Sequence, residues 1–227
     1  MNIFQIGLMR PQLEADAAVT GGIIFQIILG YILCALAAYL LGGINTSIIA
    51  SKMFFGDDIR NHGSKNAGLT NMHRVYGMKG AAMTLVGDIL KTVIAVVIGM
   101  LLMGTPGGYV AGFCTMLGHT FPVYFNFKGG KGVLCAAAAI LVLDPLTFAL
   151  LLVVFVAVVA LTKYISAASM TVAFFLPLVT HAFHQDKPYI VILIMTFCMF
   201  GFIIWTHRSN IKRLLNHEEN KFSFKKK

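Results

Sequence analysis

The chain has 227 residues, of which 58% are hydrophobic and 12% charged, and its mean hydropathy is +0.80. Soluble domains contain about 45–50% apolar and about 25% charged residues, so the composition excludes an ordinary soluble fold and favours a chain that lipid solvates. The formal net charge of +9 would suggest a nucleic-acid partner in a soluble protein. Much of the excess lies in segment 207–227, which fits the positive-inside rule and an anionic lipid surface, so we expect no nucleic acid.

Long apolar runs fill most of the chain, at 22–43, 81–103, 108–125, 132–143, 145–162, 164–181 and 188–206. They are apolar on every face, as membrane-spanning helices are. The run 132–143 is shorter than the roughly 20 residues of a full span, and Asp144-Pro145 separates it from the next run. The sequence therefore predicts an all-α, polytopic helical membrane protein with about seven transmembrane helices, some of them short, in one domain over 1–227.

The basic residues indicate how these helices are oriented. They gather in segment 44–80, in the turn 126–131, at Lys163 and in the tail, whereas the alternate loops carry little positive charge. The positive-inside rule then places these basic segments in the cytoplasm. We expect segment 1–21 outside, and the basic tail 208–227 in the cytoplasm.

The first polar cluster is D-D-I-R-N-H-G-S-K-N-A-G-L-T-N at 57–71. Glycines, small hydroxyl and amide side chains and cations together favour a backbone nest that binds phosphate, with Arg60 able to form a bidentate contact. An ordinary polar loop is the alternative interpretation.

The second cluster is G-H-T-F-P at 118–122, followed by F-K-G-G-K-G at 127–132 directly before an apolar helix. The glycines, the helix N-terminus and the charges of Lys128 and Lys131 indicate an anion-binding loop. It is not a Walker A loop, because Gly132 follows Lys131 where a Ser or Thr would be needed. A flexible turn with snorkelling lysines is the alternative.

Two further clusters begin or follow apolar runs. Ser166 and Ser169 are three residues apart and would face the same side of a helix, although helix capping by Ser166 is an alternative. His207, Asn210 and Arg213 recur every three residues after the last run, so they would share one helix face at the membrane surface.

Ionisable residues inside an apolar run are costly, so Asp88 and Lys91 are expected either to act in function or to neutralise each other at i, i+3. The motif H-x-x-x-x-D from His181 to Asp186 resembles the signature of a different, thioester-using class of acyltransferase, and we interpret it as chance. The four cysteines form no C-x-x-C pair and are expected to be buried, reduced thiols.

In this order, the four clusters resemble the motifs of the bacterial acyl-phosphate:glycerol-3-phosphate acyltransferase family (PlsY type), from about 39 to 221. The family's G-S-G-N-x-G-A-T-N after D-I-R corresponds to 63–71, its G-H-x-F-P…F-K-G-G-K-G is complete at 118–132, its Y-x-S-x-x-S corresponds to 164–169, and its H-R-x-N-I-x-R-L-L…E-x-K to 207–221. The chain departs from the family at Gly43, where a phosphate-binding serine is usual, and at Lys65 and Leu69, which replace a glycine and an alanine. Thr46 or Ser47 would then supply the missing hydroxyl.

The resemblance implies an enzyme that transfers a fatty acyl group from a long-chain acyl phosphate to the 1-hydroxyl of glycerol 3-phosphate. The products would be lysophosphatidic acid and phosphate, in the first step of phospholipid synthesis. It implies catalytic roles for Arg60, Ser64, Asn66, Lys131, Ser166, His207 and Asn210, and substrate binding by Thr46, Asn71, His119, Lys128, Gly129, Gly130, Gly132 and Arg213.

The proton acceptor stays open between His119, His207 and an oxygen of the acyl phosphate itself. We expect no cofactor and no metal, membrane lipid as a partner, and an active site on the cytoplasmic face of a bacterial cell membrane. A transporter for a phosphorylated solute and a catalytically impaired paralogue are the alternative functions.

Overall fold

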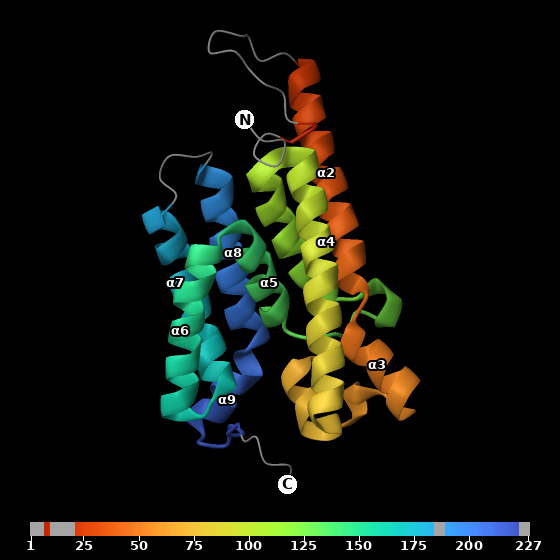
Figure 1. Ribbon diagram of the computed structural model, residues 1–227, viewed down its shortest axis with the longest axis vertical. Coiled ribbons are helices and arrows are strands. Elements are labelled where there is room, and N and C mark those ends of the chain that lie inside the picture. Colours follow the sequence, from red (N-terminus) through yellow and green to blue (C-terminus); the bar gives the residue numbers. More distant parts are fainter. Residues whose placement is uncertain (1–6, 10–20, 184–188, 223–227) are drawn as a thin grey trace.

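The computed structural model describes residues 7–9, 21–183 and 189–222, and the secondary structure of these residues is entirely helical (Figure 1). The helices are α2 (Gly21–Gly43), α3 (Thr46–Phe55), α4 (Leu69–Thr120), α5 (Val133–Leu143), α6 (Pro145–Thr162), α7 (Ile165–Phe183), α8 (Tyr189–Thr206) and α9 (Arg208–Leu215), with 3-10 turns η1 (Ile59–Asn61) and η2 (Val123–Phe125). The all-α class is confirmed. Most of segment 1–21, the end of the tail and Asp186 of the H-x-x-x-x-D motif lie outside the described residues.

Helix α4 contains a hairpin, and its two halves correspond to the apolar runs 81–103 and 108–125 of the sequence. Its backbone leaves the helical region at Gly77 and again at Met103 and Gly104, and both glycines have a φ of 68°. A Cβ placed on Gly99 would lie 2.7 Å from the Cβ of Ala111, although a straight helix would separate these residues by about 18 Å along its axis. The chain therefore reverses at Gly104, and the two halves of α4 pack side by side (Figure 1).

The expected count of seven crossings is not confirmed. Among the described residues, four helical stretches are long and apolar enough to span a membrane, namely Gly21–Phe55, Leu69–Phe125, Pro145–Thr162 and Ile165–Phe183. A fifth is added if Ile190–Thr206 and Arg208–Leu215, which are bent by 55°, count as one span. The count is lower than the number of apolar runs because the α4 hairpin joins two of them and because α5 is a short apolar helix of 11 residues.

Polar residues set the helix ends in the way their types predict. Asn45 is the N-cap of α3, and its side chain accepts a hydrogen bond from the Ile48 N–H. Asp144 caps α6, whose first position is Pro145, so the break that the sequence predicts there is confirmed.

The helices pack through small residues and a buried apolar core. α2 lies against the second half of α4, where Gly118 approaches the Tyr39 carbonyl so closely that a Cβ would be 2.1 Å from its oxygen. All four cysteines are free, as expected, but only Cys34 and Cys135 are fully buried. α3 and α9 lie at one end of the helices in Figure 1. The polar loops of the sequence motifs connect helices at this end.

Candidate active site

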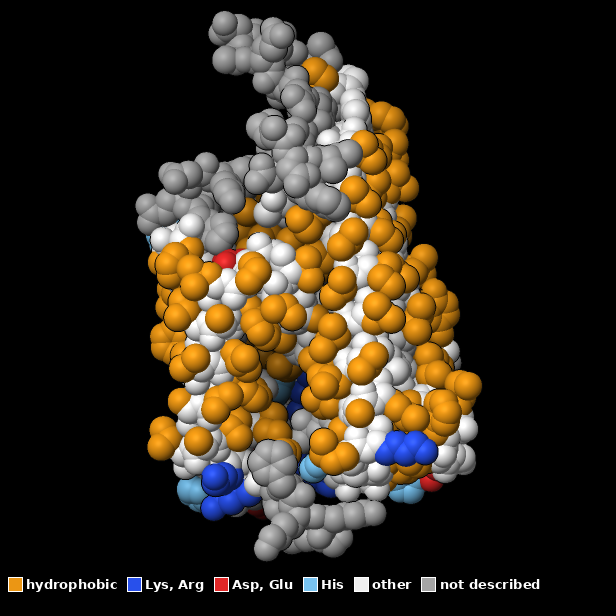
Figure 2. Space-filling view, in the orientation of Figure 1, with side chains coloured by type: hydrophobic (Ala, Val, Ile, Leu, Met, Phe, Trp, Pro, Cys, Tyr) orange, Lys and Arg blue, Asp and Glu red, His pale blue; other side chains and the backbone are white. Residues whose placement is uncertain are grey.

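A cavity of about 440 Å³ lies between α4 and helices α5 to α7. One end is polar, and the rest is lined by apolar side chains of these helices. Three of the lining residues, Leu85, Leu141 and Leu152, are more than one third exposed on the apolar outer surface. Figure 2 shows a hollow on this face, with Lys or Arg and His side chains inside it and hydrophobic side chains around it. The first cavity therefore joins a charged end to the surface that lipid would contact.

A second cavity, of about 290 Å³, lies beside the polar end of the first. Four residues line both cavities: Ser64, Asn66, Lys131 and Arg213. The second cavity adds two further cations, Lys65 and Arg208. The two cavities are neighbours and share cationic and small polar groups, an arrangement suited to two anions held side by side.

Lys131 is at the centre of this arrangement. Its ammonium donates to Oδ1 of Asn210, and its carbonyl accepts from the Thr206 hydroxyl at 3.3 Å. Burial lowers the pKa of Lys131 to about 8; the Glu219 carboxylate opposes this shift, and the charge of Arg213 adds to it. Lys131 is thus largely charged at neutral pH and within reach of an anion on either side.

The Glu219 carboxylate links three of the expected site residues. Oε1 accepts hydrogen bonds from the Ser166 hydroxyl at 3.0 Å and the Asn210 amide at 2.8 Å, and Oε2 accepts from Arg213 Nε at 2.8 Å. Burial acts to raise the pKa of Glu219, but these hydrogen bonds outweigh it and lower the pKa. Ser166 therefore does not cap α7, because its hydroxyl is bonded to this carboxylate.

The tail, as far as it is described, folds back onto the protein. The Phe222 N–H donates to the Lys163 carbonyl at 2.7 Å, and Phe222 lines the first cavity. The expectation of a simple basic tail is therefore incomplete, because its start carries part of the cavity wall.

His207 is buried beside the first cavity. Its Nδ1 lies 2.8 Å from the Ile203 carbonyl, so Nδ1 carries a proton and, in the neutral ring, Nε2 is the acceptor. The Ser169 hydroxyl donates to the Ile165 carbonyl within α7. Of these groups, His207 Nε2 is suited to receive a proton from a bound hydroxyl.

Asn71 folds the first loop from within. Its Oδ1 accepts from the Ser64 N–H at 2.9 Å, while Nδ2 donates to the carbonyls of His62 and Ile59 at 2.9 and 3.3 Å. Asn71, which is expected to bind substrate, lines the first cavity, and these bonds use its amide to position Ser64.

The glycines of the second loop are explained by close packing. The N–H of Gly129 donates to the Thr120 carbonyl and that of Gly130 to the His119 carbonyl, at 3.0 and 3.1 Å. A Cβ on Gly130 would lie 2.1 Å from His119 Nε2. Gly129 and Gly130 both line the second cavity, where their N–H groups are already bonded to backbone carbonyls, so their part in substrate binding stays a prediction. Gly132, with a φ of 79°, ends the loop and lines the first cavity.

Comparison with known proteins places this arrangement in a family. Residues 32–217 match the family model described as "Glycerol-3-phosphate acyltransferase". The chain belongs to the glycerol-3-phosphate acyltransferase family. It is 42% identical to the enzyme of that name from Clostridioides difficile over 88% of this chain and 98% of that one, and 36% identical to the one from Bacillus subtilis over 83% and 96%.

The fold of this family member agrees with two crystal structures of PlsY (YgiH), described as an integral membrane glycerol 3-phosphate acyltransferase. The glycerol 3-phosphate form has a TM-score of 0.79 at 32% identity, covering 85% of this chain and 96% of the other. The lysophosphatidic acid form has a TM-score of 0.76 at 30% identity, covering 86% and 96%. The chain is therefore a multi-pass membrane protein of this fold, and neither a solute transporter nor an inactive paralogue is favoured.

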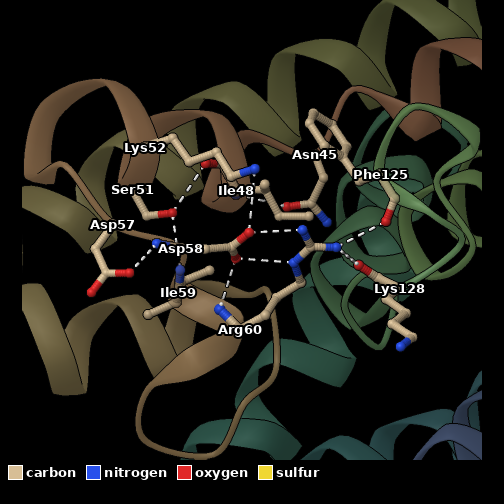
Figure 3. Close-up of polar contacts among 10 residues, drawn as sticks. All are labelled: Asn45, Ile48, Ser51, Lys52, Asp57, Asp58, Ile59, Arg60, Phe125 and Lys128. Carbon is tan, nitrogen blue, oxygen red and sulfur yellow. Dashed lines mark hydrogen bonds and ion pairs between the residues drawn. The ribbon is translucent and has the colours of Figure 1, made fainter.

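Three of the expected site residues lie outside both cavities: Arg60, Lys128 and Thr46. Figure 3 shows the Arg60 guanidinium between the Asp58 carboxylate and the carbonyl oxygens of Phe125 and Lys128. Four of its five N–H donors are used there, so the expected fork toward phosphate is already bonded to protein. The Asp58 carboxylate stands two residues away and, with Arg60 beside it, has a pKa well below its usual value.

Lys128 and Thr46 are the other two. The Lys128 side chain is exposed, and only its carbonyl contacts Arg60. Thr46 packs against Gly87 of α4. Neither lines a cavity of this acyltransferase family member.

Other residues line the cavities although the sequence analysis did not propose them as site residues. Arg74 and Asp88 line the first cavity, and Lys65 lines the second. Glu219 is the glutamate of the family's tail motif, and this motif is the feature of the sequence that points to it. Nothing in the spacing of Arg74 distinguishes it from the other cations of segment 44–80.

Proposed function

We propose that this protein transfers a fatty acyl group from acyl phosphate to the 1-hydroxyl of glycerol 3-phosphate, forming lysophosphatidic acid and phosphate. The observation that carries the proposal is the pair of neighbouring cavities sharing Ser64, Asn66, Lys131 and Arg213. This reaction needs two phosphate groups close together, one on each substrate.

The two cavities suit different substrates. The larger one has apolar walls and reaches the lipid-facing surface at Leu85, Leu141 and Leu152, so it suits the acyl chain of the donor. The smaller one is polar and bordered by Lys65 and Arg208, so it suits glycerol 3-phosphate. Lys131, between them, would contact both phosphates.

The chemistry follows from this placement. The 1-hydroxyl oxygen attacks the acyl carbonyl carbon, the bond from that carbon to the phosphate oxygen breaks, and inorganic phosphate leaves. The hydroxyl proton passes to His207 Nε2 or to the departing phosphate. Holding two reactants in line can lower the barrier by about 7–11 kcal/mol, and stabilising the developing oxyanion by about 3–4 kcal/mol more.

We further propose a single membrane-embedded domain in a bacterial cell membrane, with the site facing the cytoplasm. The cations of the motif loops lie at the end of the molecule where α3 and α9 lie, and Figure 2 shows Lys and Arg side chains at that end. The positive-inside rule favours this end as the cytoplasmic one. No metal or cofactor enters the proposed reaction.

The test is lysophosphatidic acid formation by the purified, lipid-reconstituted protein given labelled glycerol 3-phosphate and palmitoyl phosphate, with palmitoyl-CoA as the parallel donor. We expect product from the acyl phosphate, a loss of at least 100-fold in Lys131→Ala, and little change in Lys79→Ala, which removes an exposed lysine outside both cavities. Turnover of palmitoyl-CoA alone would contradict the proposed donor.

Gly43 decides between an active enzyme and an impaired one. It lies outside both cavities, and a Cβ there would be 3.1 Å from the Tyr124 ring. We therefore expect Gly43→Ser to change the turnover by less than threefold. A gain above tenfold would instead favour an impaired paralogue that lost a functional serine.

A further inference from the structure

An ion pair is buried inside α4, and the proposed reaction does not use it. Lys91 Nζ lies 2.8 Å from Asp88 Oδ1, and both side chains are at most 5% exposed. The sequence-based expectation that these two residues neutralise each other is confirmed. Buried pairs cost desolvation energy and seldom add stability over apolar residues, so a further role for this one is worth seeking.

The Lys91 ammonium joins three helical segments. It donates to the carbonyls of Gly42 and Ile44 at 3.0 and 2.9 Å, at the C-terminal end of α2, where unpaired carbonyls carry partial negative charge. It also lies 3.1 Å from His119 Nδ1, on the second half of α4. Together with the Asp88 carboxylate, these groups surround the Lys91 nitrogen with polar atoms.

These contacts fix the proton of His119. An ammonium has no lone pair and can only donate, so a hydrogen bond from Lys91 to His119 requires an unprotonated Nδ1. Asp88 Oδ1 is 3.7 Å from Nδ1, too far to take a hydrogen bond from it. The neutral ring therefore carries its proton on Nε2, the nitrogen that lies against Gly130.

His119 in turn holds the loop that carries Lys131. Its carbonyl accepts from the Gly130 N–H at 3.1 Å and from the Asn45 side chain at 3.3 Å. Its ring fills the space above Gly130, the residue directly before Lys131. A tilt of the imidazole would therefore displace the turn that sets the Lys131 ammonium between the two cavities.

We propose that Lys91 is a positioning residue: its ammonium, neutralised by Asp88, locks His119 as the Nε2–H tautomer and thereby holds Gly130 and Lys131 at the site. This inference rests on the proposed acyl transfer, in which Lys131 contacts both phosphates. Lys91 itself touches neither cavity.

The test separates the effect of the ammonium from that of the carboxylate it pairs with. Asp88→Asn is compared with the double variant Asp88→Asn/Lys91→Met, so the two proteins differ in the ammonium and not in the carboxylate. Thr92→Val is the matched control, because it removes a buried hydroxyl that bonds the Asp88 carbonyl one turn away without contacting His119. Each protein is reconstituted in lipid, and kcat, KM and the melting temperature are measured.

We expect the double variant to have a kcat/KM at least tenfold below that of Asp88→Asn at a similar melting temperature, and Thr92→Val to stay within threefold of the wild type. A double variant within threefold of Asp88→Asn would overturn the proposal, since the ammonium would then contribute nothing.

A spectroscopic measurement tests the role of Lys91 independently of the acyltransferase activity. In ¹⁵N-histidine spectra, with the His119 signals assigned from His119→Gln, we expect Nε2–H and a bare Nδ1 in the wild type, and a tautomer mixture in the double variant. A wild-type His119 protonated on Nδ1 would overturn the proposal. Absent turnover in the wild type would sink the proposed function, while these spectra would still decide the role of Lys91.

Discussion

Replacing Glu219 with glutamine tests whether the folded-back tail organises the site. The change keeps the size of the side chain and removes its charge. In the wild type the carboxylate accepts three hydrogen bonds, from Ser166, Asn210 and Arg213, at 2.8 to 3.0 Å. A glutamine can accept on one side only, so its NH₂ group must face either Arg213 or the other two donors.

The magnitude follows from these bonds. Hydrogen bonds to a charged group contribute about 1.5–3 kcal/mol each, and the Glu219 side chain is 9% exposed, so screening by water is limited. Losing the bond to Arg213 and weakening the other two should cost about 2–4 kcal/mol of folding free energy. For a chain of this size, that corresponds to a fall of roughly 5–15 °C in melting temperature.

The assay combines thermal unfolding of the reconstituted protein with lysophosphatidic acid formation. We expect Glu219→Gln to lower kcat/KM at least tenfold as well, because Asn210 positions the Lys131 ammonium. Glu218→Gln is the matched control, since it makes the same chemical change at the neighbouring, exposed position. Equal melting temperatures and activities for the two variants would refute this reasoning.

Three further predictions concern the loops. Lys65 has a φ of 59°, which a side chain disfavours by roughly 1–2 kcal/mol, so Lys65→Gly should raise the melting temperature slightly where Lys65→Ala does not. Because the pKa of Lys131 is lowered to about 8, its charge is lost as pH rises through that value; KM for glycerol 3-phosphate should therefore increase between pH 7 and 9, and Lys131→Arg should flatten this profile. Arg60→Ala should destabilise the protein by about 1–3 kcal/mol in thermal unfolding, because Asp58 loses its closer partner and keeps only the more distant Lys52. Arg208→Ala, which removes an exposed cation, should have less effect.

The helix class and the grouping of the motif loops could be predicted from the sequence. Runs apolar on every face leave few alternatives to membrane helices, and Asp144-Pro145 is a strong break and cap signal. The internal pairing of Asp88 with Lys91 also follows from their spacing, because i, i+3 places both on one helix face.

The connection inside α4 could not be predicted in the same way. The segment 104–108 contains Pro106 and three glycines, which the sequence analysis interprets as a loop. In the structure, only Met103 and Gly104 leave the helical conformation at the reversal, and Pro106 lies in the first turn of the second half, where its missing N–H costs no hydrogen bond. The composition of the segment shows where such a hairpin reverses, but not how many residues the turn takes.

The hydrogen-bond partners of the loop residues also could not be predicted from the sequence. Gly129 and Gly130 carry the composition of an anion loop, yet their N–H groups bond to the carbonyls of Thr120 and His119. Arg60 has the right side chain for phosphate, but Asp58 is two residues away and occupies its fork. Local composition shows which N–H donors are present. Whether each donates to a substrate or to another group of the protein depends on the folded structure.

Lys131 is held from two directions, and the role proposed for it between two phosphates explains why. Glu219 acts on it through Asn210, from the tail, and His119 acts through Gly130, from within the membrane helices. A flexible lysine between two phosphates would move toward whichever substrate bound first. The phosphate of the other substrate would then have no positive charge beside it. Because transfer requires both reactants in line at once, the ammonium must keep one position while either cavity fills, and two independent supports supply that rigidity.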